Sequence, residues 1–176
     1  MALFGDGNRR ELEKEAKAEG RLPPGQSLML KWPVLHAGSV PRFDAARWDF
    51  KISGLVEEPV RLTWEEFRAL PQTETQSDFH CVTRWSRLDN RWKSVLFTEV
   101  MKVVKPRPGA QFALALVEEG YRANVPLADL QRPDVLFTFD HDGEPLTAEH
   151  GGPPPADCAA FVCVEKRKVG TRVHAA

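Results

Sequence analysis

The residues best suited to chemistry lie at positions 79–86, where the chain reads Phe-His-Cys-Val-Thr-Arg-Trp-Ser. This stretch contains Cys81; the other two cysteines, Cys158 and Cys163, lie near the end of the chain. A thiol with a histidine before it and Arg84 after it lies in a positive field, which favours the thiolate that attacks electrophiles and binds metals. Cys81 is therefore the first candidate for the chemistry. The alternative is a small buried core residue, which is a common role of free cysteine.

His80 directly precedes the thiol and could act as the base of a thiol enzyme with Cys81 as nucleophile. The run at 75–80 predicts a strand that leads into Cys81. Neighbouring strand residues point to opposite faces, so His80 is poorly placed for direct proton transfer. The pattern therefore favours a metal-binding thiolate over a thiol enzyme.

Composition limits the classes of protein that the chain can belong to. With 176 residues, 42% hydrophobic and 28% charged, it has the size and balance of one soluble globular domain. A formal net charge of −1 argues against broad nucleic-acid binding. No apolar run approaches the ~20 residues of a membrane helix, and residues 1–20 contain no export signal. We therefore expect a cytoplasmic protein with reduced thiols and no membrane partner.

The pattern of short elements predicts an α+β fold. Helices are expected at 8–19, 64–70 and 97–104, strands at 48–52, 75–80, 112–117 and 135–139, and a tight turn at 140–143. Thr63 and Glu66 have the spacing of a capping box at the start of the second helix, which Pro71 ends. The elements follow no regular βαβ period, which argues against a doubly wound sheet. Trp85 and Trp92 are expected in the core.

Four blocks, in order, resemble the molybdopterin-binding domain of sulfite-oxidase-like oxidoreductases, in particular the small bacterial single-domain members. The first block is Trp32-Pro33-Val34-Leu35-His36-Ala37-Gly38 with Val40-Pro41 and then the strand ending in Ser53-Gly54, and the second is His80-Cys81-Val82-Thr83-Arg84-Trp85-Ser86 with Asn90 and Trp92. The third is Glu119-Gly120-Tyr121 with Asn124-Val125-Pro126-Leu127, and the fourth runs from Asp134-Val135-Leu136 through Gly143-Glu144-Pro145-Leu146 to Glu149-His150-Gly151. The resemblance implies the fold of that family and a cofactor of molybdenum with one molybdopterin.

The resemblance also implies the roles of individual residues. Cys81 would bind molybdenum through its thiolate, which suits a soft or high-valent metal. Arg84 would neutralise the anionic centre, with an exposed salt bridge as the alternative. The remaining matched positions are assigned to the cofactor cleft: His36, His80, Asn90, Tyr121, Asn124 and His150. We expect Cys81 to line the deepest cleft, with His36, Asn124 and His150 converging on it.

The implied activity is the transfer of an oxygen atom or electrons to or from a small oxyanion or S- or N-oxide. No haem or iron–sulfur motif occurs in the sequence, so electrons would pass to a separate partner. We expect a charged N-terminal arm at 1–25, the cofactor domain at 26–153 and an atypical tail at 154–176. The alternative is a damaged relative that lacks the cofactor and serves at most as a binding module.

The tail departs from the family pattern. In the family an arginine follows the matched histidine by five residues, and a Lys-Ser-x-Lys-Trp stretch comes later; both supply positive charge for the pterin phosphate. Here Pro155 stands at the arginine position. Codons for the tail, read one base later with free third bases, can spell PLRLIVPHLYVWKSAKWVRGF, which restores both features. We hypothesise that residues 154–176 are out of frame; the alternative is a genuine, divergent tail.

Overall fold

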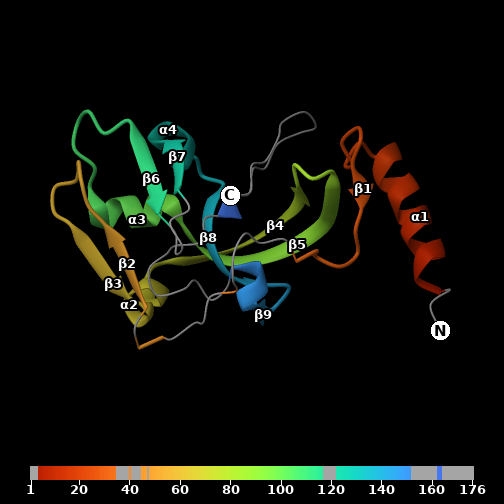
Figure 1. Ribbon diagram of the computed structural model, residues 1–176, viewed down its shortest axis with the longest axis horizontal. Helices are drawn as coiled ribbons and strands as arrows, with labels where there is room; N and C mark the ends of the chain where they lie inside the picture. Colours follow the sequence, from red (N-terminus) through yellow and green to blue (C-terminus); the bar gives the residue numbers. More distant parts are fainter. Residues whose placement is uncertain are drawn as a thin grey trace.

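A computed structural model of the chain describes residues 4–34, 40, 45–46, 48–116, 122–151 and 162–163. It contains a six-stranded sheet in the order β1-β5-β8-β10, with β4 also paired to β5 and β9 to β8, and two further two-stranded sheets, β2-β3 and β6-β7. Figure 1 shows the long β4–β5 pair running through the molecule, with helix α1 and β1 at one end and the small sheets at the other. The fold class is α+β, as predicted.

The elements have the following bounds: α1 Phe4–Ala18, β1 Ser27–Leu28, β2 Asp49–Ile52, β3 Val60–Thr63, α2 Trp64–Ala69, β4 Gln72–His80, β5 Trp85–Leu96, α3 Phe97–Val104, β6 Phe112–Leu116, β7 Arg122–Pro126, α4 Leu127–Leu130, β8 Val135–His141, β9 Glu144–Pro145, the 3-10 helix η2 Ala148–His150, and β10 Val162–Cys163. All the strands and helices predicted from the sequence occur in the described residues, with ends shifted by a few positions.

The β4–β5 hairpin is the centre of the main sheet. Its antiparallel register runs from Gln72 opposite Val95 to His80 opposite Ser86, with an irregularity between Ser77 and Phe79. The far half of β5 pairs with β8, and its first two residues pair in parallel with β1. The turn that joins β4 to β5 therefore projects from a strand that is paired on both sides.

Two apolar clusters fill the interior. The larger one lies between the small sheets, helices α2 and α3 and one face of β8, and includes Trp48, Phe67 and Phe137. The smaller one lies beside the β4–β5 turn and consists of Phe79, Cys81, Trp85, Trp92 and Leu136, with Trp32 and Leu96 packed against it. Trp85 and Trp92 are thus core residues, as predicted, with 8% and 1% exposure.

The local signals at two short elements are confirmed. Thr63 Oγ1 accepts the Glu66 N–H at 3.2 Å and the Glu66 carboxylate accepts the Thr63 N–H at 2.8 Å, which is a complete capping box. The turn after β8 contains Asp142 and Gly143 with φ values of 54° and 89°, and it reverses the chain so that β9 pairs with β8. Two successive positive φ values suit a two-residue hairpin turn, in which glycine and aspartate are favoured.

Strand β6 is confirmed, but only one of its faces is covered. Ala113 packs on the large cluster, whereas Phe112, Leu114 and Leu116 are 56–59% exposed. The strand is apolar at every position, so its sequence alone does not distinguish the covered face from the outer one.

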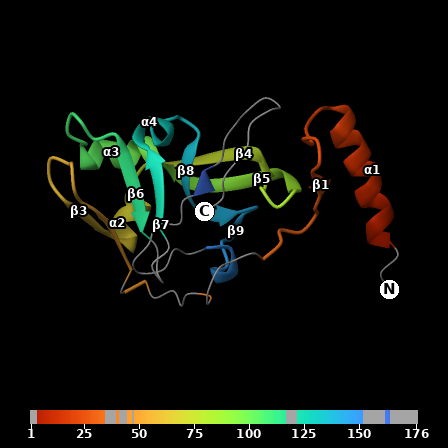
Figure 2. The same cartoon turned by 45° about the horizontal axis from the view of Figure 1, so that its top comes forward.

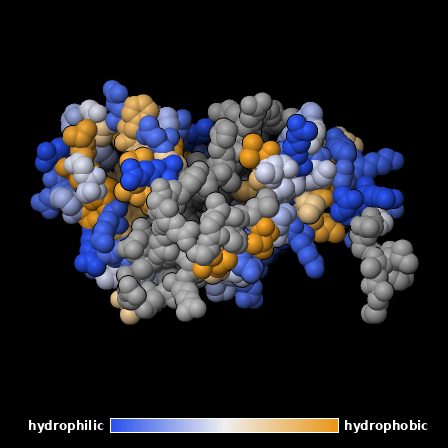
Figure 3. All heavy atoms as spheres, in the orientation of Figure 1, coloured by the Kyte–Doolittle hydropathy of each residue, from blue (hydrophilic) through white to orange (hydrophobic). Residues whose placement is uncertain are grey.

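Helix α1 is confirmed as a polar helix, in which Glu13 joins Arg9 and Lys17 through ion pairs. It lies beside β1 at the end of the molecule in both ribbon views (Figure 1 and Figure 2). The surface at that end is largely hydrophilic (Figure 3). Among the described residues, no helix has the length and apolar character needed to cross a membrane.

Replacing Thr63 by alanine should lower the free energy of unfolding by about 1 kcal/mol, because the Glu66 N–H loses its acceptor. Urea denaturation followed by circular dichroism measures this loss. Glu66→Ala should also destabilise the protein, whereas Glu65→Ala, which removes an exposed carboxylate from the same first turn, should cost clearly less. Equal losses for the two glutamate variants would contradict a role for the capping box.

Candidate functional site

The candidate site is built on the turn between β4 and β5. The Cys81 N–H donates to the Trp85 carbonyl at 2.8 Å, and the Arg84 N–H donates back to the Cys81 carbonyl at 3.0 Å. The amide of Gln26 donates a second hydrogen bond to the same Cys81 carbonyl, also at 3.0 Å. Both the N–H and the carbonyl of Cys81 are therefore hydrogen-bonded, which fixes the position of the backbone from which the thiol extends.

The thiol itself lies at the edge of the small aromatic cluster. Cys81 is 7% exposed and packs with Phe79 and Trp85, whose rings stack at a centroid distance of 5.3 Å. Its sulfur lies 3.1 Å from Thr83 Oγ1. The next residue, Val82, is 61% exposed, so the turn changes from buried to exposed within one residue. A thiol at such a boundary is sheltered, yet only a small local opening separates it from the surface.

Arg84 occupies a strained position in this turn. Its φ is 68°, which is uncommon for a residue with a side chain. Its N–H and its carbonyl are both bonded, the carbonyl accepting from Ser27 N at 3.1 Å, and the residue is exposed. The backbone bonds hold this conformation and leave an exposed cation three residues from the thiol.

His80 has its described contacts away from the Cys81 sulfur. Its Nδ1 lies 2.8 Å from Ser86 Oγ. Burial lowers the pKa of His80 below its usual value of 6.5, with the Asp78 carboxylate opposing that effect, so the imidazole is neutral at pH 7. No described hydrogen bond joins it to the thiol of Cys81. This geometry supports the expectation that His80 is poorly placed as a base for Cys81.

Trp32 connects His150 to the aromatic cluster around Cys81. The rings of His150 and Trp32 stack at 4.6 Å and 28°, and Trp32 contacts Phe79 and Trp92 in turn. His150 Nδ1 lies 2.9 Å from Thr147 Oγ1. Its Nε2 is buried and has no hydrogen-bond partner among the residues that the structure describes, and the same is true of Trp85 Nε1. Unpaired buried polar atoms are costly, so these two nitrogens are sites that a bound molecule with polar groups could satisfy.

Asn90 is a buried connector. At 1% exposure, its side-chain amide donates to the carbonyls of Ser77 and Arg87, and its oxygen accepts from Arg87 Nη1. The same oxygen lies 2.9 Å from His141 Nε2. Every polar atom of the Asn90 amide thus has a partner inside the protein.

The sequence analysis did not single out His141 or Trp32. His141 packs between Trp32 and Trp92 at ring distances of 4.8 and 4.7 Å. Arg87 Nη1 lies 2.9 Å from His141 Nε2, and burial lowers the pKa of His141. His141 Nε2 thus lies between a donor, Arg87 Nη1, and an acceptor, Asn90 Oδ1, so each tautomer of the neutral ring bonds one of these two groups. The signal in the sequence was a histidine directly before a turn, which by itself indicates only a loop residue.

The other expected residues are not all brought to this place by the described structure. Asn124 is exposed on β7, opposite Leu114. His36 and Tyr121 lie outside the described residues, as do most of the residues of the tail. The convergence of His36, Asn124 and His150 on Cys81 therefore stays a prediction.

Two cavities of the described structure lie away from Cys81. One, of about 350 Å³, lies between α1, β1 and the start of β5, and the other, of about 510 Å³, lies beside Trp48, Asp49 and Arg61. Neither is lined by Cys81. The placement of Cys81 in the deepest cleft also stays a prediction, because the segments at 35–39, 117–121 and 152–161 lie outside the described residues.

Comparisons with known proteins identify the fold and the family. The chain resembles the sulfane dehydrogenase SoxCD from Paracoccus pantotrophus with a TM-score of 0.62, at 20% identity, over 73% of this chain and 36% of that one. The fold is the sulfite-oxidase-type molybdopterin-binding fold. The model of the oxidoreductase molybdopterin binding domain family matches residues 37–168, and the chain belongs to that family of oxidoreductases.

Two curated relatives agree with this assignment. "Uncharacterized oxidoreductase YuiH" of Bacillus subtilis is 39% identical over 141 residues, which cover 80% of this chain and 71% of YuiH. "Putative protein-methionine-sulfoxide reductase subunit YedZ1" of Azospira oryzae is 30% identical over 114 residues, covering 65% of this chain and 43% of that protein. The chain thus spans most of YuiH but less than half of YedZ1.

The two partly buried histidines should lower the free energy of unfolding as the pH falls through the window just below 6.5. In the unfolded chain they take up protons near pH 6.5, whereas burial lowers the folded pKa of both His80 and His141. Their contribution is complete above pH 6.5 and is lost as the pH falls below it. Because both side chains keep some contact with solvent, the slope should be shallow.

Urea titrations at several pH values measure this slope. The double variant His80→Gln/His141→Gln should have a flatter profile than the parent in this window. Asp78 and Asp142, whose pKa values are lowered, titrate at more acidic pH and serve as internal controls. An unchanged slope in the double variant would show that neither histidine is the group responsible.

Proposed function

We propose that this chain is a molybdenum–pterin oxidoreductase that transfers an oxygen atom or electrons to or from a small oxyanion or S- or N-oxide. The observation that carries the proposal is the sheltered Cys81 thiol, fixed at its backbone by three hydrogen bonds and surrounded by aromatic rings, in a chain of this family. A soft donor with a fixed backbone beside aromatic rings suits a metal centre better than a nucleophile that needs a nearby base.

The donor set fits such a cofactor. Among the described residues, no group of three or more His, Cys, Asp or Glu side chains could hold a metal ion by itself. A metal bound at Cys81 would therefore take its other ligands from the cofactor. The unpaired nitrogens of His150 and Trp85 supply polar contacts next to the same aromatic cluster. When bound, the cofactor would supply the two-electron redox chemistry.

The residues of the chain would bind and orient the reacting groups. Cys81 would ligate the metal, His150 would contact the pterin, and Arg84 would attract an anionic substrate to the exposed side of the turn. We also assign His36, Tyr121 and Asn124 to the cofactor cleft on the strength of the family blocks. His80 and Asn90 would act indirectly: His80 through Ser86, and Asn90 by holding Arg87 and His141.

The partners follow from the chemistry. The substrate would be a small molecule, and the electrons would leave to a separate carrier, because the sequence has no second redox motif. We place the protein in the cytoplasm. Cell fractionation, and purification from the native host with bound electron carriers, test these two statements.

The tail decides whether the chain, as its sequence stands, retains the cofactor. We propose that residues 154–176 are out of frame, since the shifted reading restores the arginine and the Lys-Ser-x-Lys-Trp stretch. In the present reading, Val162 and Cys163 already pair with Leu136 and Val135 of β8, so a short strand at this place does not depend on the shifted reading. The family match, which extends to residue 168, favours the alternative of a divergent tail. Sequencing the gene distinguishes the two readings.

Loss of phosphate contacts should be visible in metal content. Charge-assisted contacts contribute about 1.5–3 kcal/mol each, so the absence of an arginine and a lysine would weaken cofactor binding by about two orders of magnitude or more. The chain with its present tail should therefore purify with little molybdenum, and the version with the restored frame with close to one per chain. Stoichiometric molybdenum and pterin in the present chain would overturn the predicted effect of the tail.

Substitution of Cys81 tests the metal ligand directly. In the version with the restored frame, Cys81→Ser should abolish turnover and the thiolate-to-metal absorption, because a serine oxygen is a poor replacement for a soft thiolate. Stability should change little. Val82→Ser, at an exposed position in the same turn, is the matched control and should retain both signals. If no version of the chain binds molybdenum or pterin, the cofactor-free alternative holds.

A further inference from the structure

Gln26 joins the N-terminal segment to the backbone of the candidate metal ligand. Its side-chain Nε2 donates to the Cys81 carbonyl at 3.0 Å, across 55 positions of sequence. That carbonyl also accepts from Arg84 N at 3.0 Å, so both of its lone pairs are used. Gln26 thus supplies the one described side-chain hydrogen bond to the backbone of Cys81.

The other end of the Gln26 amide is held as well. Ser86 Oγ donates to Gln26 Oε1 at 3.4 Å, and Ser86 Oγ lies 2.8 Å from His80 Nδ1. Because Ser86 Oγ has one proton and donates it to Gln26 Oε1, it accepts from His80 Nδ1, and the hydrogen bonds all run one way, from His80 through Ser86 and Gln26 to the Cys81 carbonyl. Successive bonds of the same direction polarise one another and favour a single orientation of the amide.

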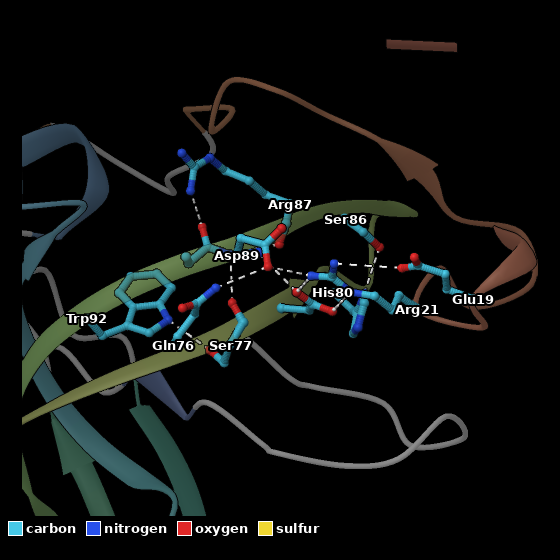
Figure 4. A network of polar contacts seen from close by, with 11 residues as sticks. Glu19, Arg21, Gln76, Ser77, His80, Ser86, Arg87, Asp89 and Trp92 are labelled. Atoms are coloured by element: carbon cyan, nitrogen blue, oxygen red, sulfur yellow. Dashed lines mark hydrogen bonds and ion pairs between the residues drawn. The ribbon is translucent and has the colours of Figure 1, made fainter. Parts of the chain in front are cut away.

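The segment that carries Gln26 is itself anchored on both sides. Ser27 N donates to the Arg84 carbonyl at 3.1 Å, and Met29 N donates to the Ser86 carbonyl at 2.8 Å. Before Gln26, Arg21 binds both oxygens of Asp78 through its Nε and Nη2, at 3.0 and 2.6 Å, and its Nη2 reaches Asp89 at 2.7 Å. Figure 4 shows Arg21, Asp89, His80 and Ser86 in this polar network along the β4–β5 hairpin.

We propose that Gln26 is a positioning residue for Cys81: it holds the turn closed and sets the direction in which the thiolate approaches a bound metal. This proposal rests on the proposed function only for the identity of the metal. The effect of Gln26 on the accessibility of the Cys81 thiol does not require a bound metal or cofactor. Gln26 lies before the matched range of 37–168, so the family match does not include it. The segment before the family domain would then be part of the site.

The rate at which a thiol reagent labels Cys81 tests the proposal without any cofactor. In a background with Cys158→Ser and Cys163→Ser, Cys81 is the only thiol, and its 7% exposure means that labelling requires local opening of the turn. Gln26→Met keeps the side-chain length but removes the amide. It should raise the labelling rate by 5,5′-dithiobis(2-nitrobenzoate) about five- to tenfold, the effect of one lost hydrogen bond.

Gln72→Met is the matched control. Its amide also donates to a backbone carbonyl, that of Arg68 at 2.6 Å, but at the start of β4, far along the hairpin from the turn. It should leave the labelling rate within about twofold of the parent, since the bond does not belong to the Cys81 turn. Urea denaturation of both variants separates local opening from a general loss of stability.

Two further measurements complete the test. Ser86→Ala should raise the labelling rate less than Gln26→Met and add nothing when combined with it, because both variants interrupt the same chain of bonds. In protein loaded with the cofactor, Gln26→Met should shift the thiolate-to-metal absorption band at unchanged molybdenum content, and Gln72→Met should leave the band in place.

The outcomes distinguish this inference from the proposed function. An unchanged labelling rate in Gln26→Met, or an equal rise in Gln72→Met, would overturn the role of Gln26 whether or not the protein binds molybdenum. A higher labelling rate of Cys81 in Gln26→Met but not in Gln72→Met supports that role, even if no molybdenum is found and the proposed function fails.

Discussion

The antiparallel pairing of β4 with β5 is the constraint on which the rest of the structure depends. The pairing aligns Phe79, Trp85 and Trp92 beside one short turn, and the bond between Cys81 N and the Trp85 carbonyl closes that turn. A turn at the end of two long paired strands has little freedom to move, because any displacement breaks ladder bonds below it. The position of the thiol is thus a consequence of sheet register rather than of the loop sequence alone.

The aromatic cluster beside the turn shields the Cys81 thiol from solvent, and the hydrogen bonds around the cluster orient its side chains. Trp32 comes from a segment far away in sequence, yet it contacts Phe79, Trp92, His141 and His150. Its ring joins the cysteine side of the site to the histidine side. Apolar burial has no preferred direction, so the polar contacts of Asn90, Arg87 and His141 are needed to fix where each ring lies.

The N-terminal segment has a larger part in this arrangement than its composition indicates. Charged, polar sequence before residue 26 reads as a solvated arm, and α1 is indeed a polar helix. Arg21, however, forms a bidentate ion pair with Asp78 on β4. Two parallel bonds between a guanidinium and a carboxylate fix geometry as well as charge, so they can hold the segment in register with the sheet.

The sequence by itself determined the elements and the family. Local signals were sufficient for the capping box at Thr63, for α3 and for the turn at Asp142, because each depends on residues within one turn of chain. The order of four motif blocks was sufficient for the sulfite-oxidase-type fold and for Cys81 as the candidate ligand. These features are readable because backbone propensity and motif spacing are properties of neighbouring residues.

Only the tertiary structure decided which distant groups meet. The contact of Gln26 with the Cys81 carbonyl spans 55 positions, and the stacking of Trp32 on His150 spans more than twice as many. Nothing in the sequence near Asn90 distinguishes a buried connector from a cofactor ligand, and nothing in β6 tells its exposed face from its covered one. The physical reason is that burial and side-chain pairing depend on sheet register and on packing between segments, which local sequence does not encode.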